Sequence, residues 1–132
     1  MTTQNQETIE YLFNDAEELL TLAVRELDAG DIRQAAEKAW CATVASANGL
    51  LLARTGQKPP TTARSRIMLE AEAERDSGLD SLRLRFLSRE TSLHGACFYD
   101  GICEPRNAIE RRIRETADFI RDAREHAANW SQ

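Results

Sequence analysis

An arginine and a histidine five residues apart are the residues of this sequence best suited to chemistry. They are Arg89 and His94, in the stretch RETSLHGACFYDG over residues 89–101. Cleaving RNA without a metal requires a group that takes the proton of the 2′-hydroxyl, a group that protonates the leaving oxygen, and positive charge beside the phosphate. Histidine suits both proton transfers and the guanidinium suits the third task. The pair therefore indicates an endoribonuclease site, with His94 as acid and base and Arg89 as stabiliser of the transition state.

Other residues of the stretch could support that reaction, namely Glu90, Tyr99 and Asp100. Tyr99 could stack on a base or donate to a phosphate, although a tyrosine at a helix end also packs with its hydroxyl in water. In a regular helix five residues turn through about 500°, which leaves Arg89 and His94 roughly 140° apart. The alternative for His94 is therefore a partly buried histidine that is hydrogen-bonded to a neighbouring helix.

Arginines on both sides of this stretch could attract a phosphate backbone. Arg85 precedes it, and Arg106 and Arg111 follow it. If the helices that carry them pack antiparallel, their guanidinium groups could converge at one end. The other interpretation is a solvated face on which arginines pair with acidic residues at helical spacing.

The charge of the chain restricts its partners. At 132 residues with a formal charge of −5, the protein as a whole does not attract nucleic acid. Residues 1–79 carry 8 basic and 13 acidic side chains, whereas residues 80–132 carry 9 of each. We therefore expect no DNA binding, and any contact with RNA or a nucleotide must be local. The chain also lacks the glycine-rich motifs that cradle phosphates.

The three cysteines, Cys41, Cys97 and Cys103, are an odd number without the spacing of a disulfide framework. No signal peptide is evident, and no apolar run approaches the ~20 residues that span a bilayer. We therefore expect a cytoplasmic protein in a reducing setting, whose cysteines are small core residues. Zinc would need a fourth ligand beside His94, Cys97 and Cys103, and His126 is the only other histidine, so we expect no metal and no cofactor.

Hydrophobic residues recur at three- and four-residue steps, and no segment alternates with a period of two. We expect helices over residues 7–28, 32–55, 63–76 and 80–100, and a fifth helix with Pro105 in its first turn. Gly30 ends the first helix, and Asp31 caps the second with Gln34 three residues on. Small residues surround Trp40 in the second helix, which we expect at the centre. The sequence predicts a single all-α domain, an up-and-down bundle of four to five helices.

Two stretches of the sequence resemble a known family. The first is AGDIRQAAEKAW over residues 29–40, and the second combines LH at 93–94 with FYD at 98–100. They are similar to the PaREP-type paralogous families best known from archaea, which are placed near the HEPN superfamily of helical domains. The resemblance covers residues 10–125 approximately, and it implies a HEPN-like helical bundle that usually forms a homodimer.

The resemblance carries two functional expectations. In active HEPN members an R-x(4–6)-H motif forms a metal-independent endoribonuclease site at the dimer cleft, often in defence or toxin–antitoxin systems, and Arg89 and His94 match it. The alternative is a non-catalytic homodimeric adaptor that binds a nucleotide or a partner such as a nucleotidyltransferase. A third interpretation is a purely structural oligomer, with the alanine-rich second helix as its seam and Trp40 as an anchor in the core or the interface.

Overall fold

Helices make up the protein, and residues 2–130, which its computed structural model describes, contain no β-strand. In chain order the elements are α1 (Thr3–Asp28), α2 (Ile32–Thr55), α3 (Thr62–Arg75), the short 3₁₀ turn η1 (Ser77–Leu79), α4 (Asp80–Arg89), the π-helical segment η2 (Glu90–Tyr99), α5 (Arg106–Arg114) and α6 (Thr116–Trp130). Because α4 continues into η2 and only Glu115 separates α5 from α6, these elements correspond to five successive rods. The predicted all-α bundle is confirmed.

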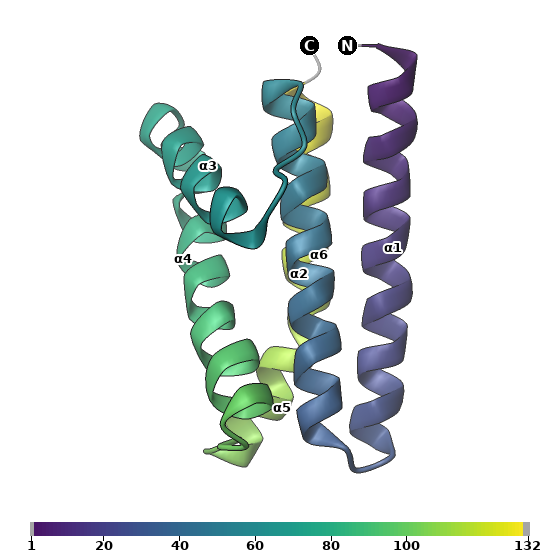
Figure 1. Ribbon diagram of the computed structural model, residues 1–132, viewed down its shortest axis with the longest axis vertical. Coiled ribbons are helices and arrows are strands. Elements are labelled where there is room, and N and C mark those ends of the chain that lie inside the picture. The colour runs from purple at the N-terminus through teal and green to yellow at the C-terminus, as the bar shows by residue number, and fades with distance from the viewer. Residues whose placement is uncertain (1, 131–132) are drawn as a thin grey trace.

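The small-residue helix α2 lies at the centre of the bundle, as predicted. It packs against α1 and α6 along its length and also contacts η2, α3, α4 and α5. Figure 1 shows α1, α2 and α6 running side by side. Alanines fill the inner surface of α2 and are almost completely buried: Ala35, Ala36, Ala39, Ala42 and Ala47. Short side chains let neighbouring helix axes come close, so α2 can have neighbours on several sides.

Helices α2 and α1 approach each other closely at Gly49. A Cβ atom built on Gly49 would lie 2.7 Å from Cε2 of Phe13, whose side chain is buried on α1. The aromatic ring therefore occupies the space that any other residue at position 49 would need.

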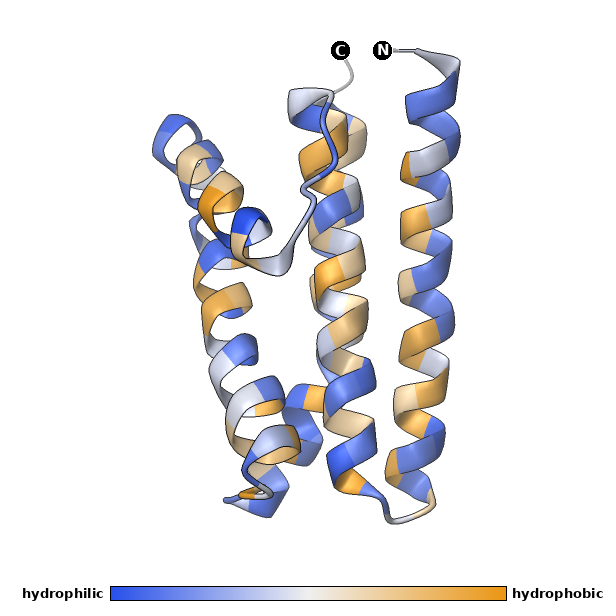
Figure 2. Ribbon diagram, in the orientation of Figure 1, coloured by the Kyte–Doolittle hydropathy of each residue, from blue (hydrophilic) through white to orange (hydrophobic). Residues whose placement is uncertain are grey.

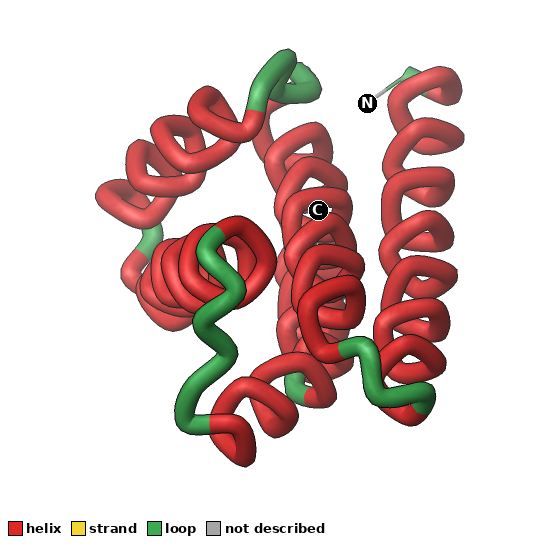
Figure 3. The backbone as a smooth tube through the Cα atoms, turned by 60° about the horizontal axis from the view of Figure 1, so that its bottom comes forward, coloured by secondary structure: helices red, strands yellow, loops and turns green. Residues whose placement is uncertain are grey.

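The remaining helices form a second layer beside α2. Figure 3 shows the rod of α4 and η2 set apart from the group of α1, α2 and α6, with α3 and α5 on either side of it. Hydrophobic residues of α1 lie mainly on the side that faces α2, and hydrophilic residues lie on its outer side (Figure 2). Within residues 2–130 no helix combines the length and apolar character needed to cross a membrane.

Capping residues set the helix boundaries. The side chain of Asp31 accepts a hydrogen bond from the backbone N–H of Gln34 at 3.1 Å, so the predicted cap of α2 is confirmed. The start of α1 was placed four residues too late, because the hydrophobic pattern begins only at Ile9. The first turn is polar, and Thr2 caps it by accepting from the N–H of Asn5 at 3.1 Å.

The last two predicted helices differ from expectation. The α-helical winding that was predicted up to residue 100 ends at Arg89, where η2 begins. Pro105 is the N-cap of α5 rather than a first-turn residue, and its peptide bond with Glu104 is cis. The final helix is divided at Glu115, whose N–H still bonds to the carbonyl of Arg111 at 2.8 Å.

The expectation of three reduced core cysteines is wrong. Cys97, at the end of η2, forms a disulfide bond with Cys103 in the connection to α5. Cys97 is completely buried as predicted, whereas the free Cys41 lies exposed on α2. The spacing of six residues did not predict the disulfide bond. The two cysteines come together only because the chain turns back at Gly101, which has a positive φ of 72°.

We predict that Gly49→Ala lowers the free energy of unfolding by about 1–3 kcal/mol, because the new methyl group overlaps the Phe13 ring. Gly95→Ala is the matched control, since its Cβ would meet only the carbonyl oxygen of Glu90 at 3.6 Å. The control should be neutral or slightly stabilising, as expected for glycine to alanine in a helix. Urea denaturation measures both, and equal stability of the two variants would contradict the close packing of α1 and α2.

We predict that Cys103→Ser lowers the free energy of unfolding by about 2 kcal/mol, as expected for opening a short disulfide loop. Cys41→Ser removes the exposed free thiol and should leave stability unchanged. Thiol titration of the unfolded, unreduced protein should detect one thiol per chain, and three after reduction. Three thiols before reduction would contradict the bond.

Candidate functional site

His94 lies in η2 and forms a hydrogen-bonded pair with Glu37 of α2. Its Nδ1 lies 2.8 Å and 3.1 Å from the two carboxylate oxygens of Glu37. Both side chains are partly buried, with 34% of His94 and 22% of Glu37 exposed. A carboxylate at Nδ1 favours the tautomer with the proton on that nitrogen, so Nε2 remains to accept or return a proton. The pair thus has the geometry of an oriented acid–base group.

The change from α- to π-helical winding sets the direction of His94. At the C-terminal end of η2 the N–H of the C-cap residue Asp100 bonds to the carbonyl of Gly95, five residues earlier, at 3.1 Å. A π-helix has more residues per turn than an α-helix. The separation of roughly 140° expected between Arg89 and His94 assumed α-helical winding. It therefore does not apply here.

Aromatic rings surround the His94 imidazole. Its ring centroid lies 6.0 Å from that of Trp40, 6.3 Å from that of Phe98 and 5.2 Å from that of Tyr99. Trp40 is buried and also packs against Phe86, with ring centroids 5.0 Å apart, so it anchors the core of the protomer. Tyr99 is 70% exposed. The series of rings runs from the core to the surface.

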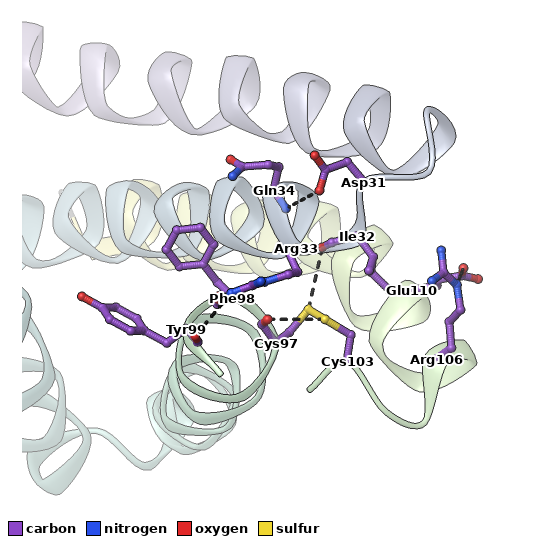
Figure 4. The surroundings of a disulfide bond; sticks show 10 residues. All are labelled: Asp31, Ile32, Arg33, Gln34, Cys97, Phe98, Tyr99, Cys103, Arg106 and Glu110. Carbon is purple, nitrogen blue, oxygen red and sulfur yellow. Dashed lines mark hydrogen bonds and ion pairs between the residues drawn. A yellow bond between two sulfur atoms is a disulfide. The ribbon is translucent and has the colours of Figure 1, made fainter. Parts of the chain in front are cut away.

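An open pocket of about 490 Å³ lies beside the outer rings. Its lining residues come from the start of α2 and the end of η2: Asp31, Arg33, Gln34, Phe98 and Tyr99. Arg33 connects the two elements, because its Nε and Nη2 donate to the carbonyl oxygen of Phe98 at 3.1 Å and 2.6 Å. In Figure 4 the rings of Phe98 and Tyr99 project to one side of η2, away from the disulfide bond.

Arg89 points into the interior. Only 5% of the residue is exposed, its Nε donates to Oγ1 of Thr43 at 2.9 Å, and its Nη2 donates to Oγ1 of Thr116. Burial, together with the positive charge of Arg85, lowers the pKa of Arg89 to about 10. The group therefore remains charged near neutral pH and links α2, α4 and α6.

The structure does not bring Arg89 and His94 into one hydrogen-bonded site. Their partners on α2 are Thr43 and Glu37, six residues apart, which corresponds to about 9 Å along the helix axis. In this chain His94 therefore has a carboxylate partner, Glu37, whereas the guanidinium of Arg89 is hydrogen-bonded to Thr43 and Thr116.

The sequence matches one family model over most of its length. The match, to the Archaeal PaREP1/PaREP8 family, covers residues 12–120. The chain belongs to this archaeal PaREP1/PaREP8 family. No curated protein matches it significantly.

The supporting residues predicted for this PaREP1/PaREP8 chain have separate positions. Tyr99 lines the pocket near His94. Glu90 instead accepts hydrogen bonds from Arg66 of α3 at 3.2 Å. Asp100 is the exposed C-cap of η2, and its backbone N–H, not its carboxylate, makes the capping hydrogen bond to Gly95. Of the three, only Tyr99 joins the site.

The predicted phosphate-binding arginines do not converge. Arg85 is partly buried and donates to the carboxylate of Asp122 at 2.9 Å. Arg106 pairs with Glu110 on the exposed surface of α5 at 3.0 Å, and Arg111 is also exposed. Arg85 lines a different pocket, to which neither Arg106 nor Arg111 contributes.

The pocket and the His94 pair of this PaREP1/PaREP8 chain use residues that the sequence did not single out for chemistry. Glu37, Arg33 and Gln34 all lie in the segment 29–40 that carried the resemblance. Residues 33 and 37 are four apart and share one helix face. These residues could have been found by searching the face of α2 that packs against η2 for polar side chains, but the sequence alone does not show that the two helices pack together.

No metal centre is present in the described part of the chain. Within residues 2–130 no group of three histidine, cysteine, aspartate or glutamate side chains is placed to hold a metal ion. The sulfurs of Cys97 and Cys103 are bonded to each other and so are not thiolate ligands. The groups that the site offers are the His94 imidazole, oriented by Glu37 for proton transfer, and the exposed Tyr99 ring for stacking.

We predict that Arg89→Ala lowers the free energy of unfolding by about 2–4 kcal/mol, because it removes two buried hydrogen bonds and leaves a cavity. Arg111→Ala, an exposed arginine, should change it by less than about 0.5 kcal/mol. Chemical denaturation measures both. Equal stability of Arg89→Ala and Arg111→Ala would contradict the structural role of Arg89.

Proposed function

We propose that this PaREP1/PaREP8 protein is a HEPN-like helical module that binds an unpaired nucleobase in the pocket beside His94. The observation that carries the proposal is the exposed Tyr99 ring at the edge of a pocket that also holds Phe98 and Gln34. Bases stack on exposed aromatic rings, and this contact contributes about 1–3 kcal/mol per base. Single-stranded RNA is the class of ligand that presents such bases.

Polar groups of the same pocket suit the edge of a base. The side-chain amide of Gln34 has both a donor and an acceptor, and the carboxylate of Asp31 is an acceptor. Two nitrogens of Arg33 are already engaged with backbone carbonyls, and Glu37 and Asp100 add negative charge nearby. The pocket therefore favours an uncharged base over a phosphate group.

The HEPN-like assignment rests on the helical bundle and on the resemblance of residues 29–40, 93–94 and 98–100 to PaREP-type families, which are placed near the HEPN superfamily. A HEPN-like chain is expected to form a homodimer, which would present two copies of the pocket. The position of Arg89 favours a binding role, because the guanidinium that should stabilise a cleavage transition state is held by Thr43 and Thr116 and does not share a hydrogen-bonded site with His94.

A second candidate function is metal-independent cleavage of the bound RNA. The pair of His94 and Glu37 favours it, because a carboxylate that orients imidazole is a common arrangement in acid–base catalysis. This reaction would need positive charge from a source other than Arg89, and the second protomer of a dimer is the natural one.

We predict that Tyr99→Ala weakens the binding of a fluorescently labelled single-stranded RNA about tenfold or more, because it removes the stacking surface. Fluorescence anisotropy measures the dissociation constant. Tyr11→Ala is the matched control, since Tyr11 is similarly exposed, at 66%, but lies on α1. Equal affinities of both variants and the original protein, or no binding at all, would rule out the pocket as a nucleobase site.

The same RNA distinguishes binding from cleavage. The protein, His94→Ala and Glu37→Gln are incubated with a mixed RNA pool in excess chelator, and the ends of any products are mapped. We expect intact RNA throughout. Products with cyclic phosphate ends that disappear in both variants would replace the binding role with the catalytic one.

A further inference from the structure

A second pocket lies between α4 and the junction of α5 with α6. It has a volume of about 230 Å³. Three arginines and three other polar residues line it: Arg85, Ser88, Arg89, Arg112, Glu115 and Asp118. None of them belongs to the pocket beside His94.

Arg89 is a buried cation whose partners are neutral. Its hydrogen bonds go to the hydroxyl groups of Thr43 and Thr116, and among residues 2–130 no carboxylate lies within 4.0 Å of its guanidinium nitrogens. Transferring a charge from water into a protein interior costs free energy that an opposite charge normally offsets. Because Arg89 lines the pocket, an anion bound there could supply the opposite charge.

The neighbouring charges leave an excess of guanidinium groups. Arg85 is paired with Asp122, and Arg121 bonds both Asp118 and Asp122 at 3.1 Å. Arg112 forms no ion pair with any residue in the range 2–130. Three guanidinium groups thus line the pocket against two carboxylates, those of Glu115 and Asp118. Two of the three, on Arg89 and Arg112, have no carboxylate of residues 2–130 within 4.0 Å.

We propose that this pocket binds a phosphate group through Arg89 and Arg112. Arginine donates in a planar fork that fits tetrahedral phosphate oxygens, and Ser88 can add a hydroxyl donor. Glu115 opposes the anion and limits its affinity. The bound phosphate connects α4 to the end of α5, where Arg112 lies, and offsets the buried charge of Arg89. The site is independent of the proposed nucleobase pocket.

Inorganic phosphate is the probe that tests this site. Thermal unfolding is followed during a phosphate titration, with sodium chloride at equal ionic strength as the reference. The melting temperature should rise saturably with phosphate and not with chloride. Arg112→Gln should raise the apparent Kd at least tenfold, whereas Glu115→Gln should lower it severalfold because it removes a like charge.

The control for general electrostatics is Arg111→Gln, which removes an exposed arginine next to Arg112 but outside the pocket. It should leave the apparent Kd unchanged. Equal effects of Arg111→Gln and Arg112→Gln, or equal stabilisation by phosphate and chloride, would overturn the proposal. Circular dichroism verifies that each variant is folded before titration.

Two further experiments identify the source of the phosphate and test whether the two pockets are independent. A nucleoside monophosphate that competes with phosphate, where the nucleoside alone does not, identifies a nucleotide phosphate; failure to compete identifies a free phosphate. Tyr99→Ala should leave phosphate affinity unchanged. Loss of phosphate binding in Tyr99→Ala would mean a single site and would overturn the separate pocket.

Discussion

The close packing of α2 against its neighbours is the constraint on which the rest of the structure depends. Its inner surface is made of alanines and of Gly49, which meets the Phe13 ring, so every other helix can contact α2. The same helix supplies the hydrogen-bond partners of Arg89 and His94. Thr43 holds Arg89, and Glu37 holds His94. Because Thr43 and Glu37 lie on one helix, their spacing determines the relative positions of the Arg89 guanidinium and the His94 imidazole.

The two pockets lie at different parts of the rod formed by α4 and η2. Arg89 ends the α-helical part and contacts Thr116 at the start of α6, whereas His94 belongs to the π-helical part and contacts α2. A motif that is continuous in sequence is thus divided between two environments. One is interior and cationic, and the other is aromatic and partly exposed.

Periodic apolar residues predicted the all-α class, the small residues of α2 predicted its central position, and Asp31 with Gln34 three residues on predicted its cap. They could not predict the π-helical winding, because it changes hydrogen-bond partners without interrupting the hydrophobic pattern. His94 and Tyr99 were found from residue type. Their partners, such as Glu37, were missed because the pairing of η2 with α2 joins residues 57 positions apart in the chain.

The disulfide bond changes what a break in the chain between η2 and α5 would do. Cys97 and Cys103 stand on either side of the exposed turn at Asp100 and Gly101. A protease that cut this turn would produce two polypeptides that remain covalently joined, with α5 and α6 still tethered to the rest of the bundle. They would migrate as separate fragments only after reduction, so the connection tolerates a nick without releasing the two C-terminal helices.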